Sequence, residues 1–85
     1  MPQPDPAQIQ ALLAEDKLSA AGEVAALLLV PRALRQELLA WQGRLAYLQA
    51  SADRGELTRE EATVERNRLR RALIAWLERA CPGTT

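Results

Sequence analysis

The chain has 85 residues, of which 48% are hydrophobic, and its eleven basic and eleven acidic side chains cancel to a net charge of zero. This length fits one small domain, and the neutral charge disfavours the global attraction expected of a nucleic-acid or anionic-membrane binder. Histidine is absent and there is a single cysteine, which excludes an internal disulfide and removes the residues most often used as metal ligands and general bases.

The first expected helix covers residues 6–16, after an extended lead-in at residues 1–5. Asp5 is placed to cap this helix, and Pro6 suits its first position because its fixed φ is already helical. A helix this short is marginal by itself, so it must pack against the rest of the chain.

A second short helix is expected at residues 20–30, with Ser19 as its cap and Pro31 as its stop. Its last turn is apolar on most sides, which a half-exposed helix does not require. Either this turn is buried all round, or part of it faces a partner; Leu28 and Leu29 are therefore candidate partner-binding residues.

Two longer helices are expected at residues 32–54 and 59–80, because two rows of mainly apolar residues mirror each other about Leu57. Alternating spacings of 4 and 3 are typical of a helix packed along another helix. Each row continues for six residues: Leu34, Leu38, Trp41, Leu45, Leu48 and Ala52 in the first, and Ala62, Arg66, Leu69, Leu73, Trp76 and Ala80 in the second.

The segment between the rows has the composition of a turn. Gly55 supplies a left-handed residue to close the first long helix, and Thr58 with Glu61 forms a T-x-x-E capping box that opens the second. The chain therefore predicts an antiparallel helical hairpin. Residues 81–85 form a tail typical of the start of a linker in a longer protein.

These elements predict an all-α fold: a small four-helix bundle, one domain over residues 1–85, with the two short N-terminal helices packed on the long C-terminal hairpin. We expect the short helices to cover the flank that carries Leu39, Ala46 and Ala50. Gly43 lies on the same flank, and a glycine inside a helix indicates a close backbone approach there.

Aromatic and charged residues divide into structural and partner-facing candidates. Trp41 and Trp76 lie on the seam and are expected in the core, while Tyr47 lies beside the seam and is a candidate surface anchor. Arg66 is the charged member of the seam. We interpret it as structural, with its guanidinium reaching Asp53, Glu56 or an acid of the first helix; the alternative is a partner-facing arginine.

Arg59 and Arg70 are further candidates for partner contact. Together with Arg68 and Arg71 they could form a basic stripe for phosphates, but no aromatic residues interleave with them. A solvated helix face is the favoured interpretation, and nucleic acid is a disfavoured ligand.

No catalytic residue, metal site or cofactor is predicted. The sequence has no glycine-rich phosphate loop and no second cysteine for a thiolate cluster, so an enzyme is not expected. No apolar run reaches the length of a membrane span, and the N-terminus lacks the basic start of a signal peptide. We expect a cytoplasmic protein that does not bind membranes.

The second half of the chain resembles the bacterial effector-associated domain family, in its type eleven. The resemblance rests on Gly43–Leu48, on the Arg54–Gly55 turn with Thr58 and the acids after it, and on the E-R-N-R-hydrophobic run at residues 65–69. It implies a small helical adaptor of bacterial conflict and immune systems, used much as death-like domains are. It also implies that Glu65, Arg66 and Asn67 matter for fold or contact.

The expected function is therefore protein–protein interaction. The resemblance implies a homotypic adaptor, which pairs with another copy or with a matching helical domain and recruits a protease, a caspase-like enzyme or a nucleotide-binding sensor. A homo-oligomer is compatible with this role. The alternatives are a generic helical dimerisation or docking domain and, less favoured, a nucleic-acid-binding regulator.

Overall fold

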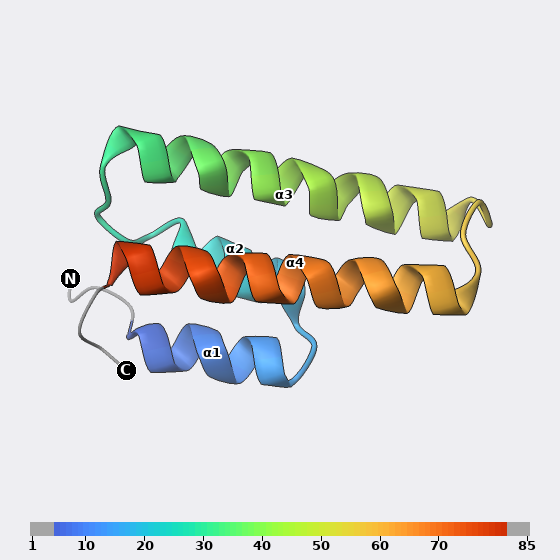
Figure 1. Cartoon of the computed structure of the whole chain (residues 1–85), viewed down its shortest axis with the longest axis horizontal. Coiled ribbons are helices and arrows are strands. Elements are labelled where there is room, and N and C mark those ends of the chain that lie inside the picture. Colours follow the sequence, from blue (N-terminus) through green and yellow to red (C-terminus); the bar gives the residue numbers. More distant parts are fainter. Residues whose placement is uncertain (1–4, 82–85) are drawn as a thin grey trace.

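A computed structural model describes residues 5–81, and these residues form four helices and no strand. The helices are α1 (Pro6–Ala14), α2 (Leu18–Ala25), α3 (Arg32–Asp53) and α4 (Arg59–Ala80). Figure 1 shows α3 and α4 side by side as a long antiparallel hairpin, with α1 running along α4 and α2 behind them. This arrangement confirms the all-α bundle predicted from the sequence.

The predicted seam forms the core between α3 and α4. Apolar members of both rows are buried: Leu34, Leu38, Trp41, Leu45, Leu48, Leu69, Leu73 and Trp76. The predicted row on α3 is wrong at the turn end of the hairpin. Ala52 is exposed there, and Ser51 is buried instead. The helices thus bury position 51 at the next turn after Leu48, which the strict alternation of spacings did not anticipate.

Both tryptophans join the two long helices through hydrogen bonds as well as packing. Trp41 Nε1 donates to the Leu69 carbonyl oxygen at 2.7 Å, and Trp76 Nε1 donates to the Leu34 carbonyl oxygen at 2.8 Å. A buried indole N–H needs such a partner, so each ring has a defined place in the interface. The two bonds fix the register of α3 against α4 at two separate points.

The caps expected at three helix ends are present. Asp5 Oδ1 accepts from the Ala7 amide, and Thr58 and Glu61 form the complete reciprocal capping box. Gly55 has a φ of 75° and closes α3, with the Gly55 and Glu56 amides donating to carbonyls of the last turn. These bonds satisfy backbone groups that a helix end otherwise leaves unpaired.

Helix α1 ends at Ala14, two residues before the predicted end. Asp16 has a φ of 63°, and the Asp16 and Lys17 amides donate back to the carbonyls of Leu13 and Leu12. This is the same closing motif as at Gly55, with aspartate in the left-handed position that glycine usually takes. The early end was missed because aspartate is a weaker signal for that conformation.

Helix α2 spans Leu18–Ala25, so the prediction of residues 20–30 was wrong at both ends. Ser19 lies inside the helix rather than at its cap. The N-cap residue of α2 is Lys17, whose side chain makes no capping hydrogen bond. After Ala25 the chain tightens into a turn in which the Leu27 and Leu28 amides donate to carbonyls three residues earlier. The chain must reverse before Pro31, and this turn buries Leu28 while the helix stops.

The short helices cover a different flank of α3 from the one predicted. Gln42 Nε2 donates to the Gly22 carbonyl oxygen at 3.2 Å and Gln49 Nε2 to Ser19 Oγ at 3.0 Å, so α2 packs on the glutamine side of α3. Leu39 and Ala46 are exposed, and Ala50 is half-buried. The close approach expected at Gly43 occurs instead at Gly22, where an added Cβ would lie 2.7 Å from Trp41 Cζ3.

Candidate functional site

The side of the hairpin that α1 and α2 leave uncovered contains a large hollow. It is an open groove of about 1160 Å³ between the second half of α3 and the first half of α4. We call it the hairpin groove. Its lining residues are Ala40, Gly43, Arg44, Tyr47, Leu48, Ser51, Glu56, Leu57, Glu60, Glu61, Val64, Glu65, Arg68, Leu69 and Ala72.

The groove exists because small residues face each other across the hairpin. Ala40 and Gly43 on α3 and Ala72 on α4 leave space that larger side chains would fill, and an added Cβ at Gly43 would meet nothing within 4 Å. Two large hydrophobic side chains in the lining are exposed: Tyr47 at 70% and Val64 at 50%. The groove therefore offers accessible apolar surface for a partner.

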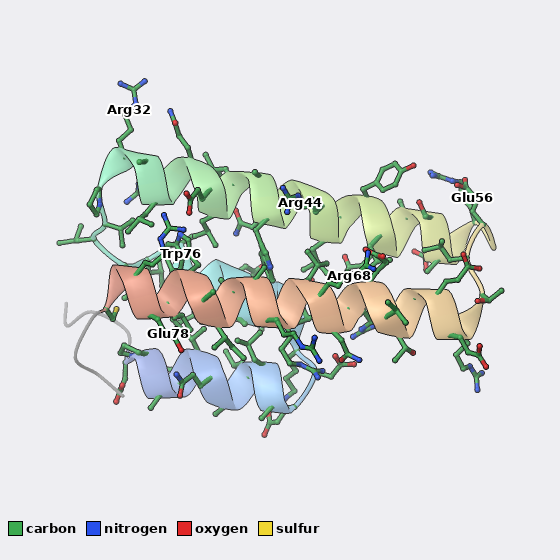
Figure 2. The ribbon with its side chains drawn as sticks, viewed as in Figure 1. Arg32, Arg44, Glu56, Arg68, Trp76 and Glu78 are labelled. Carbon is green, nitrogen blue, oxygen red and sulfur yellow. The ribbon has the colours of Figure 1, made fainter. Side chains whose placement is uncertain are left out.

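Carboxylates outnumber guanidinium groups in the groove. Its lining has the four glutamates 56, 60, 61 and 65 and the two arginines 44 and 68. Figure 2 shows Arg44 on α3, Arg68 on α4 and Glu56 at the turn that joins the two helices. Arg68 Nη1 donates to Glu65 Oε1 at 3.0 Å, whereas Glu60 and Arg44 have no ion pair within residues 5–81. The groove lining thus combines small and apolar side chains with a surplus of two carboxylates.

A second, smaller hollow of about 360 Å³ continues the groove toward the start of α3 and shares Ala40, Arg44 and Ala72 with it. It ends at Arg79, whose Nη1 lies 2.8 Å from Glu37 Oε2. The hydrogen bond that Arg79 donates to Glu37, together with the negative charge of that carboxylate, raises the pKa of the Arg79 guanidinium. This ion pair ties the end of α4 to the start of α3 on the same face.

The five residues predicted to contact a partner do not form one surface. Tyr47 lines the hairpin groove, Arg59 is exposed at the start of α4, and Leu29 is exposed in the segment between α2 and α3. Leu28 is wrong as a contact residue because only 2% of its surface is accessible. Arg70 is half-buried and bonded within the chain, to Asp16 at 2.9 Å and to Asn67 at 3.0 Å, so its contact with a partner stays a prediction.

Asp16 joins the end of α1 to the middle of α4. Its carboxylate accepts from Arg66 Nη2 at 2.8 Å and from Arg70 Nη2 at 2.9 Å, and its carbonyl oxygen accepts a further bond from Arg66 at 3.2 Å. The left-handed backbone at Asp16 places its carboxylate and its carbonyl oxygen within reach of the two arginines. The E-R-N run adds the Glu65–Arg68 pair and the Asn67–Arg70 bond, so its members make contacts within the fold.

We expect Arg66→Met to lower the free energy of unfolding by about 1 kcal/mol while leaving self-association unchanged. The side chain loses a half-exposed ion pair and a hydrogen bond to Asp16, but it is absent from the groove lining. Urea denaturation at low and high salt measures this, with a smaller difference at high salt. Unchanged stability with lost association would instead make Arg66 a partner-facing residue.

Within residues 5–81 no group of three or more histidine, cysteine, aspartate or glutamate side chains could hold a metal ion. No helix in that range is long and apolar enough to span a membrane.

Comparison with known proteins identifies a family model that matches the chain. No curated protein and no solved structure matches it significantly. The family model described as effector-associated domain 11 matches residues 4–80, which is nearly the whole chain.

Proposed function

We infer a function from the family to which the chain belongs, effector-associated domain 11, which is an accessory domain associated with effectors. From this membership we propose that the chain is a homotypic adaptor. It pairs through the hairpin groove with another copy or with a matching helical domain. In this way it recruits or tethers an effector, such as a protease, a caspase-like enzyme or a nucleotide-binding sensor, in a bacterial defence system.

The observation that carries this proposal is the uncovered face of the hairpin. A four-helix bundle normally buries both long helices in its core. Here the two short helices cover one side of the hairpin. The other side has a groove that is lined by small residues and by exposed Tyr47 and Val64. Such a groove suits an apolar segment of another protein.

The charges of the face favour protein over nucleic acid as the ligand. The groove lining has four glutamates against two arginines, which repels a phosphate backbone. Two members of the sequence-predicted basic stripe are also engaged within the chain, Arg68 with Glu65 and Arg70 with Asp16.

Sedimentation equilibrium of the isolated domain tests the proposal. We expect the average mass to rise with concentration between micromolar and millimolar. The double variant Tyr47→Glu/Val64→Glu should stay at the monomer mass with unchanged helicity, because both side chains are exposed and two charges would have to be buried at the interface.

A matched control adds the same two charges elsewhere. Gln8→Glu/Gln10→Glu changes exposed side chains of α1, outside the groove, and should associate as the wild type does. A wild-type mass that stays at 9.4 kDa over the whole range would overturn the homotypic proposal.

A further inference from the structure

A second exposed apolar surface lies where the chain passes from α2 into α3, at the end of α3 that is away from the turn bordering the groove. The segment between α2 and α3 presents Leu27 and Leu29, which are 68% and 78% exposed, on either side of buried Leu28. Leu39, 61% exposed, lines one small hollow with Leu28 and Arg35. We call Leu27, Leu29, Arg32, Arg35 and Leu39 the loop patch. Its three leucines are all more than half exposed.

The loop patch is basic where the groove is acidic. Arg32 and Arg35 are exposed and make no ion pair within residues 5–81, and the patch as defined has no acidic residue. Figure 2 shows Arg32 pointing away from the bundle at the start of α3. The groove has a surplus of two carboxylates, including Glu60, which has no ion pair among the same residues. The two surfaces are therefore complementary in polarity and in charge.

One molecule cannot bring its own patch into its own groove. Arg32 begins α3 and Glu56 follows its end, and α3 is 22 residues long, which separates its two ends by roughly 33 Å. The groove runs from Ala40 to the turn at Glu56, whereas positions 27–35 of the patch lie in the α2–α3 segment and the first turn of α3 (Figure 1). The loop patch can only fill a groove on another molecule.

Building on the proposed function, we infer that two copies associate head to tail, with the loop patch of one copy in the hairpin groove of the next. Leu27 and Leu29 pack into the space that the small residues Ala40, Gly43 and Ala72 leave in the groove. Arg32 and Arg35 of one copy face the glutamates that line the groove of the next copy. The two halves of this contact are different surfaces. A pair of copies therefore keeps one patch and one groove unfilled, and further copies extend the assembly into a chain or close it into a ring.

Two variants, each defective in one half of the contact, test the inference by mixing. Leu27→Asp/Leu29→Asp removes the patch and keeps the groove, while Tyr47→Lys/Val64→Lys places two basic charges opposite Arg32 and Arg35, and so removes the groove and keeps the patch. All four side chains are at least half exposed, so helicity should be unchanged. Each variant by itself should associate at least about tenfold more weakly than the wild type. Mixed in equal amounts, they should form a dimer that does not grow further.

The possible results separate the inference from the proposed function. A 1:1 dimer in the mixture, with weakened association of each variant, supports head-to-tail contact. If the wild type associates and the patch variant associates equally well, or if the mixture stays monomeric, the head-to-tail contact is overturned while homotypic pairing stands. If the wild type is itself monomeric up to millimolar concentration, the homotypic proposal fails together with the inference. Gln8→Glu/Gln10→Glu is again the control that should match the wild type.

Discussion

Trp41→Ala is expected to lower the free energy of unfolding by about 3–5 kcal/mol, which is the usual cost of truncating a buried aromatic residue to alanine. Trp41 is 5% exposed, lies against Gly22 of α2 and donates its indole hydrogen bond to the Leu69 carbonyl of α4. Its loss therefore loosens three helices at once. Small domains are typically stable by about 5–15 kcal/mol, so the melting temperature should fall sharply in a thermal scan followed by circular dichroism.

Trp41→Phe separates packing from hydrogen bonding. It keeps most of the buried ring but removes the donor to Leu69, so we expect a smaller loss, with about 1 kcal/mol of it from the hydrogen bond. Equal stability of the alanine and phenylalanine variants would contradict the place assigned to this ring in the core.

Gly22→Ala is expected to destabilise the domain by about 1–3 kcal/mol, although alanine is the better helix former. The new Cβ would lie 2.7 Å from Trp41 Cζ3, so either the ring or α2 must move. Because the same ring is hydrogen-bonded to Leu69, its movement also weakens the contact with α4. Urea denaturation should show a lower midpoint for this variant.

Gly43→Ala is the matched control, since it is the same substitution inside a helix. Nothing lies within 4 Å of an added Cβ there, so we expect stabilisation by up to about 1 kcal/mol from helix propensity. If both substitutions stabilised the protein, the packing of α2 against Trp41 would be wrong.

The hairpin could be predicted from the sequence because its signals are local and repeated. Two rows with alternating spacings define the seam, while Gly55 and Thr58 mark the turn between them by well-known end signals. The structure buries Trp41 and Trp76 on that seam and gives Gly55 the expected left-handed conformation.

The ends of α1 and α2 and the position of the groove depend on contacts distant in sequence. Asp16 takes a left-handed conformation where it can bind Arg66 and Arg70 of α4, and no local pattern shows that. Gly22 and Gly43 are both helical glycines, and only the crossing of α2 over α3 decides which one needs its small size.

The groove was missed for the same reason. Its lining follows a second stripe beside the seam, at positions 40, 43, 47 and 51 of α3, position 57 in the turn, and positions 61, 64, 68 and 72 of α4. The spacings of 3 and 4 are visible in the sequence and mark a face of each helix. Whether α1 and α2 cover that stripe or leave it open is a tertiary property, so Tyr47 alone of the groove residues was predicted as a contact.

The central claim is that the uncovered face of the hairpin is the binding face. The most direct test is a dilution series of the wild-type domain followed by amide nitrogen–proton NMR spectra. We expect the resonances that shift with concentration to cluster at residues 43–51 and 60–68, with a second cluster at residues 27–35. Shifts confined to the exposed face of α1, or spectra that do not change with concentration, would contradict the claim.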